Sequence, residues 1–233
     1  MEWQKIYYLD MMLVPCGFLI LIVYHFWLWH MSKTQPFTTI CGRDADGRRF
    51  WVASMMKDID NKNTLAVQTL RNMIMGTTLM STTSILLCAG LGAIISSNYS
   101  VKKPINDSIL GAHGEFMVLI KYGIILTILS FSFMCNTLSG AFINQVNILI
   151  GTPQNVKSLV TPEYLTQHLK KAMLLNIVGS RLFYTALTLQ LWIFGPVLPF
   201  LSSMLMVCIL YNLDFVDGDH PMNAELDFIK NDP

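Results

Sequence analysis

Three long apolar stretches are separated by polar segments in the first 150 residues. They cover residues 9–29, 73–95 and 116–135. Each is about as long as the 20-residue helix that crosses a hydrocarbon core of about 30 Å. Their charged residues are Asp10 and Lys121, both near one end of a stretch. The pattern predicts three transmembrane helices.

A fourth apolar stretch covers residues 172–213 and is about twice as long as one span. Gly195 and Pro196 divide it near its middle. This pair interrupts a helix, because proline lacks a backbone donor and glycine weakens the helix. We expect a helical hairpin with arms at 172–194 and 197–213. The short second arm is at the lower limit for a span, so five spans are predicted, with four spans and a re-entrant arm as the alternative.

Residues 48–72 are expected to form a helical segment outside the membrane. The Gly- and Asp-rich residues 42–47 before it are typical of a surface turn, so the helix should begin near Arg48. Helix should resume near Asn63 and continue unbroken into the second span. Mixed apolar and basic residues place such a segment either on the membrane surface or against the bundle.

Further helix boundaries follow from local signals. Thr161 can cap a helix that has Pro162 at its first position. The helical pattern of the third span continues as a more polar stretch to Ile150. We therefore predict one transmembrane domain over residues 1–216, followed by an acidic tail at 217–233.

Composition supports this fold class. Apolar residues make up 53% of the chain and charged residues 13%, against about 25% charged residues in soluble domains. The mean hydropathy is +0.47. A net charge of +1 gives no field that would attract nucleic acid. We predict an all-α, polytopic transmembrane helical bundle whose partner is the lipid bilayer, in a membrane that the sequence does not identify.

No motif predicts a cofactor. The five cysteines and five histidines lack metal-site spacing, and no hydrolase, metalloprotease or nucleotide-binding motif is present. We therefore predict no metal and no catalytic residue, and an enzyme is the less favoured interpretation. A haem held between different spans stays an alternative.

The distribution of Lys and Arg predicts the orientation. Cytoplasmic loops are rich in these residues, and the segment between spans one and two holds seven of them. This places the N-terminus outside and the C-terminus inside. Two sequons, at Asn98 and Asn106, then lie in an outer loop and are candidate glycosylation sites.

Small polar residues recur along one face of the second span. Helix packing, within or between subunits, is the favoured interpretation, and a polar path is the alternative. The face could thus support a homo-oligomer. The residues of this face are Thr77, Ser81, Ser84, Cys88, Gly92 and Ser96.

The third helix carries Asn136, Asn144 and Asn147 at helical spacing. An asparagine in hydrocarbon is costly unless it has a partner. These residues should therefore line either a cavity or a polar contact between helices.

Arg181 is the most unusual residue within a span, about 13 Å along the fourth helix. We expect it to meet asparagine, carbonyl groups or an acidic partner, although no acidic residue lies at an obviously matching depth. Asn176 is a neighbour at best. Arg71 and Asn72 lie at the inner end of span two, where Arg71 could contact lipid phosphate or pair with Asp214. Lys121 should extend outward to water.

Several segments resemble the plant membrane family named domain of unknown function 599. They are LAVQTLRNMIMGTTLMSTTSILLCAGLGAIISS (65–97), YSVKKPINDS (99–108), GAHGEFMVLIKY (111–122), FINQVNILI (142–150), RLFY (181–184), WIFGPVLPFL (192–201) and LYNLDFV (210–216). The resemblance covers most of the chain and implies a multi-pass helical membrane protein from a plant. The family has no established activity, so the resemblance implies no catalytic residue.

Three functions remain open. Arg181, the asparagines of the third helix and the small-residue face favour a channel or transporter-like pore. The basic first inner loop favours a non-catalytic scaffold or lipid-interacting protein. A membrane haem or redox protein has the least support.

Overall fold

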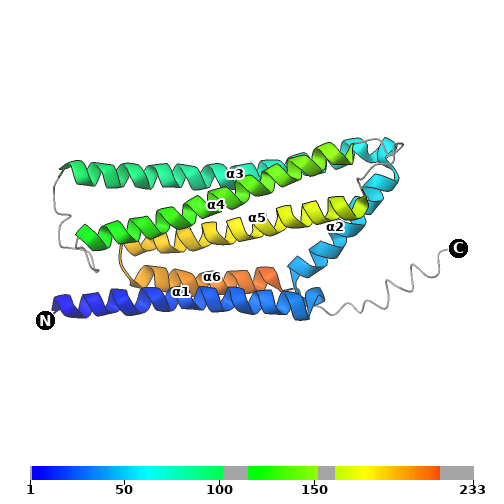
Figure 1. Ribbon diagram of the computed structural model, residues 1–233. Helices are drawn as coiled ribbons and strands as arrows, with labels where there is room; N and C mark the ends of the chain where they lie inside the picture. Colours follow the sequence, from blue (N-terminus) through cyan, green and yellow to red (C-terminus); the bar gives the residue numbers. More distant parts are fainter. Residues whose placement is uncertain (1, 102–114, 152–160, 216–233) are drawn as a thin grey trace.

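The computed structural model describes residues 2–101, 115–151 and 161–215, and these residues are almost entirely helical (Figure 1). The helices are α1 (Glu2–Thr34), the short η1 (Pro36–Thr38), α2 (Ile40–Lys57), α3 (Ile59–Val101), α4 (Glu115–Ile150), α5 (Pro162–Gln190), the short η2 (Leu191–Ile193) and α6 (Val197–Asp214). The predicted all-α fold is confirmed.

Among the described residues, five helices are long and apolar enough to cross a membrane, as predicted. The apolar segments are Asp10–Thr34, Lys62–Ser97, Met117–Ile150, Pro162–Ile193 and Val197–Asp214. A helix of 18 residues extends about 27 Å, so even α6 nearly matches the hydrocarbon core. The longer α3, α4 and α5 must continue beyond the core, which is the arrangement of an integral membrane protein.

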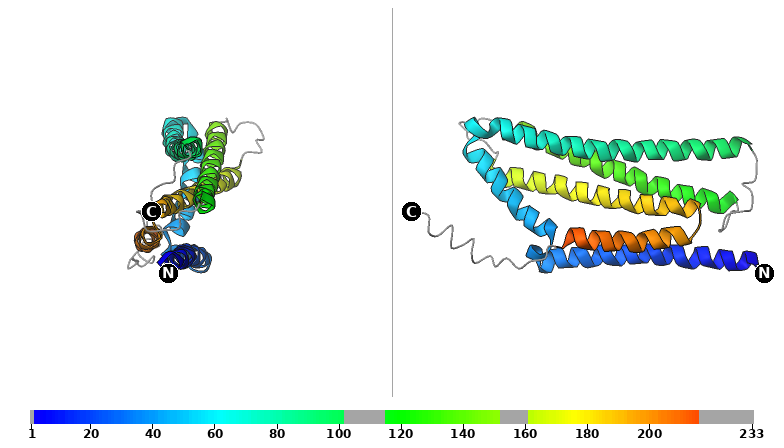
Figure 2. Two further views of the ribbon diagram at one scale, coloured as in Figure 1. Left: turned by 90° about the vertical axis from the view of Figure 1, so that its left-hand side faces the viewer. Right: turned by 180° about the vertical axis from the view of Figure 1, so that it is seen from behind.

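The helices form two units. Helix α4 packs along both α3 and α5, whereas α1 pairs with α6. Figure 2 shows α1 and α6 on one side of the molecule and α3 and α4 on the other, with α5 between them. Helix α2 begins beside the ends of α1 and α6 and runs obliquely to the start of α3 (Figure 1). We call this the α2 end of the bundle, and the opposite end, at η2, the hairpin end.

The predicted hairpin is present. Gly195 has a positive φ of 156°, a conformation that glycine adopts more readily than other residues, and α6 starts after Pro196. Where α1 and α6 pair, a Cβ on Gly17 would lie 3.4 Å from the backbone of Phe200. The small residue therefore allows these two helices to approach closely.

The expected surface turn at residues 42–47 is wrong, because α2 begins at Ile40. The Thr39 hydroxyl caps this helix by accepting from the Gly42 N–H at 3.4 Å. A Cβ at Gly42 would lie 2.0 Å from the Pro36 carbonyl oxygen. The glycine therefore permits a compact helix start rather than a turn, and Asp44 and Arg48 form an i, i+4 ion pair along the helix.

Other boundaries agree more closely with the sequence. Helix α4 ends at Ile150, and Thr161 caps α5 by accepting from the Tyr164 N–H. Helix α3 starts at Ile59 rather than near Asn63, and it continues unbroken into the second span. The acidic tail at 217–233 lies outside the described residues.

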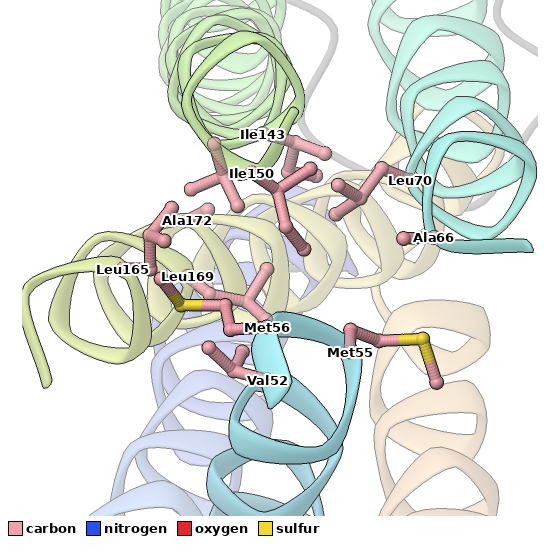
Figure 3. Packing of buried hydrophobic residues seen from close by; sticks show 11 residues of the cluster. Val52, Met55, Met56, Ala66, Leu70, Ile143, Ile150, Leu165, Leu169 and Ala172 are labelled. Carbon is pink, nitrogen blue, oxygen red and sulfur yellow. The ribbon is translucent and has the colours of Figure 1, made fainter. Parts of the chain in front are cut away.

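Two apolar cores stabilise the bundle at different levels. At the α2 end, Val52 and Met56 of α2 lie beside Leu165 and Leu169 of α5 (Figure 3). This core binds α2 to the bundle and confirms that the helix packs against it. The second core lies toward the hairpin end and comprises Val14, Leu91, Tyr122, Ile125, Leu129, Phe183, Ala186, Leu189 and Trp192.

Candidate functional site

A buried ion pair joins α1 to α4 near the hairpin end, and with Trp192 it forms what we call the Asp10 cluster. Lys121 Nζ lies 3.1 Å from Asp10 Oδ2, and the two side chains are 4% and 1% exposed. Trp192 donates its indole N–H to Asp10 Oδ1 at 2.8 Å. The prediction that Lys121 extends to water is wrong, because Asp10 supplies a charged partner inside the protein.

A second ionic contact, the Arg181 cluster, joins α5 to α6 and α1. The Arg181 guanidinium donates to Asp214 Oδ1, and the Tyr24 hydroxyl donates to Asp214 Oδ2 at 2.7 Å. Asp214 is therefore the acidic partner of Arg181, although the sequence did not indicate that the two residues lie at the same depth. Side chains of α5 tilt toward its N-terminus, at the α2 end, where α6 finishes with Asp214. The proposed pairing of Asp214 with Arg71 is wrong, and Arg71 is exposed.

The small polar residues of α3 face α4. The Ser81 and Thr137 hydroxyls lie 2.7 Å apart, and those of Ser84 and Ser132 lie 3.2 Å apart. The structure thus confirms packing, here within one chain, as the use of this face. The homo-oligomer stays a prediction.

Asn136 lies in a polar contact between α4 and α5. Its Nδ2 donates to the Ser132 carbonyl at 2.9 Å, and the Ser132 hydroxyl donates to the Gly179 carbonyl at 2.8 Å. A Cβ on Gly179 would lie 2.6 Å from Asn136 Nδ2. Asn136 is therefore fully buried where α4 meets α5, and the hydrogen bond that crosses between these helices comes from Ser132.

The remaining candidates are dispersed. Asn144 and Asn72 are exposed, and Asn147 is half-buried. Asn176 is half-buried and lines the groove described next. Of the two sequons, Asn98 lies in the last turns of α3, and Asn106 lies outside the described residues.

A groove of about 710 Å³ lies between α2, α3 and α5, and we call it the α2 groove. Its walls extend from Thr69 to Met80 on α3 and from Leu169 to Ser180 on α5, with Ile143 of α4 between them. Each wall spans 11 helical steps, or about 17 Å. The other lining residues are Arg43, Asp44, Gly47, Arg48, Trp51, Met73, Gly76, Thr77, Met173 and Asn176.

The charges of the α2 groove are confined to α2. Arg43 is exposed and donates its Nε–H to the Phe37 carbonyl at 2.8 Å, which leaves its terminal amino groups for other contacts. Arg48 is 19% exposed, and its Nη1 lies 3.7 Å from Asp44 Oδ2. Away from α2 the walls carry no charge and their surface is mostly apolar, and Thr69, Thr77, Asn176 and Ser180 are the polar residues among them. The groove therefore has a polar mouth and an apolar interior.

Sequence reasoning missed Asp10 and Tyr24 as interaction sites and did not connect α2 to a groove. Asp10 is the charged residue of the first apolar stretch, and an ionisable residue within a span is a strong indication of a specific partner. No comparable signal marks the α2 groove, because its walls come from helices far apart in sequence.

Within the described ranges, no group of three or more His, Cys, Asp or Glu side chains could hold a metal ion. A family model described as "Protein of unknown function, DUF599" matches residues 12–218. No curated protein and no solved structure matches the chain.

Proposed function

The chain belongs to the DUF599 family of proteins of unknown function, and we propose that it is a lipid-interacting membrane protein that holds one phospholipid in the α2 groove. The observation that carries this proposal is the combination of an apolar groove with arginines at one end. Lipids have the matching division between an acyl chain and a charged headgroup.

The length of the groove fits one membrane leaflet. Its α3 and α5 walls extend about 17 Å, and half of a hydrocarbon core is about 15 Å. Both walls belong to helices that are apolar enough to cross a membrane. An acyl chain could therefore follow Met73, Met80 and Met173, whose flexible side chains adapt to irregular ligands.

The headgroup end is set by α2. Arg43 and Arg48 line the groove in the half of α2 that lies nearest α1 and α6 (Figure 1). Guanidinium groups suit phosphate because they offer several donors in a fixed plane. The distribution of Lys and Arg predicts that this end faces the cytoplasm, so the lipid would come from the inner leaflet.

Native mass spectrometry of the detergent-solubilised protein tests the proposal with phosphatidylserine as the probe. Loss of a charge-assisted phosphate contact in Arg48→Ala should weaken binding about 10- to 100-fold. Arg49→Ala is the matched control, because it removes the same charge from the adjacent, exposed position outside the groove. Equal losses in the two variants would contradict the proposal.

Two further ligands separate the parts of the site. Diacylglycerol lacks the phosphate, and glycerophosphoserine lacks the acyl chains. Both should bind more weakly than the intact lipid. If glycerophosphoserine binds as tightly as phosphatidylserine, the apolar groove plays no part, and the proposal fails.

A transporter-like pore is the second candidate, and the placement of the two ionic clusters favours it. The Asp10 cluster joins the two helical units near the hairpin end, and the Arg181 cluster joins them toward the α2 end. Ionic contacts that break and form in turn could close a solute path between the two helical units alternately at the hairpin end and at the α2 end. Ion or solute flux in proteoliposomes tests this candidate, and flux that is absent in the wild type, Arg181→Ala and Asn136→Ala alike would contradict it.

A further inference from the structure

We infer that the α2 groove selects a headgroup that carries an ammonium group in addition to its phosphate. The inference rests on the proposed lipid binding and adds the class of headgroup. The observation behind it is Asp44, which lines the groove together with Arg43 and Arg48. Asp44 already pairs with Arg48 along α2, and a headgroup with both an ammonium group and a phosphate would complement this carboxylate and the two arginines better than phosphate alone.

Asp44 is available to a ligand. Its side chain is 58% exposed, and its contact with Arg48 Nη1 is long, at 3.7 Å from Oδ2. A carboxylate has about four acceptor positions on its two oxygens. It can therefore accept from an ammonium group while it stays near Arg48.

The backbone leaves space beside this carboxylate. Gly47 lies one turn further along α2 and also lines the groove. A Cβ at Gly47 would have no atom within 4 Å. The headgroup can thus reach the helix surface between Asp44 and Arg48 without displacing a side chain.

The three charged groups at the mouth have a natural complement. Two guanidinium groups match two anions, and one carboxylate matches one cation. The phosphoserine headgroup carries a phosphate, a carboxylate and an ammonium group. Phosphatidylglycerol has the same net charge but no ammonium group, so Asp44 would meet no cationic group of that headgroup.

Competition between phosphatidylserine and phosphatidylglycerol tests the inference by native mass spectrometry. The wild type should prefer phosphatidylserine about tenfold, the effect of about one charge-assisted hydrogen bond. Asp44→Asn should abolish most of this preference. Asp46→Asn is the matched control, because Asp46 is exposed on the same helix outside the groove, and it should retain the preference.

The outcomes distinguish this inference from lipid binding itself. Equal binding of the two lipids by the wild type, or an unchanged preference in Asp44→Asn, would overturn the headgroup assignment. Lipid binding in the groove would still stand after either of these results if Arg48→Ala binds the two lipids less tightly than Arg49→Ala does. If Arg48→Ala and Arg49→Ala bind lipid equally well, the proposed function itself is overturned.

Discussion

Removal of one charge from the Asp10 cluster should destabilise the protein more than removal of both. In Asp10→Asn the Lys121 ammonium stays buried without its anion, and in Lys121→Met the Asp10 carboxylate loses its cation. Breaking a buried pair in this way costs about 3–5 kcal/mol. The pair qualifies because the Asp10 and Lys121 side chains are only 1% and 4% exposed.

The double variant Asp10→Asn, Lys121→Met leaves no unpaired charge. Replacement of a whole buried pair is often nearly neutral, and the asparagine carbonyl still accepts from Trp192. We therefore expect a loss much smaller than the sum of the single losses, which a double-mutant cycle reports as a coupling energy.

Thermal unfolding in detergent measures these effects. For a chain of this size, about 3–5 kcal/mol corresponds to a decrease of about 6 to 20 °C in Tm. Asp46→Asn and Lys57→Met, at exposed positions, are controls that should stay within about 0.5 kcal/mol of the wild type. Single variants as stable as these controls, or additive losses in the double variant, would refute the reasoning.

Two further substitutions test contacts between helices. Gly179→Ala places a methyl group 2.6 Å from Asn136 Nδ2, and this clash should lower the free energy of unfolding by about 1–3 kcal/mol. The control is Gly90→Ala, whose methyl group meets open space and should not destabilise the helix. Equal effects of the two substitutions on thermal unfolding would contradict the close packing of α4 and α5. Tyr24→Phe removes a hydrogen bond to the Asp214 carboxylate and should cost about 1.5–3 kcal/mol in the same assay, so an unchanged Tm would argue against the Arg181 cluster.

The spans were predictable because their signals are local. Apolar length identifies a membrane helix without knowledge of its neighbours, and the Gly195-Pro196 break and the Thr161 cap depend on adjacent residues only. The start of α2 was missed, because residues 42–47 have a turn-like composition. The close contact between Gly42 and Pro36 becomes visible only in three dimensions.

The ionic partners were not predictable for a different reason. Arg181 and Asp214 lie on the two arms of a hairpin, and their relative depth depends on the reach of a long side chain along α5. Asp10 and Lys121 are 111 positions apart, so the sequence indicates that each needs a partner without identifying it. The α2 groove likewise exists only because α2, α3 and α5 meet.

The location of bound lipid tests the central claim most directly. A phosphatidylserine with a photoactivatable group in its acyl chain should cross-link to Met73, Met80 or Met173 in the α2 groove, as mapped by peptide mass spectrometry. Arg48→Ala should reduce these adducts, and Arg49→Ala should not. Adducts spread evenly over exposed positions such as Leu205 of α6, with the groove methionines unmodified, would contradict the account.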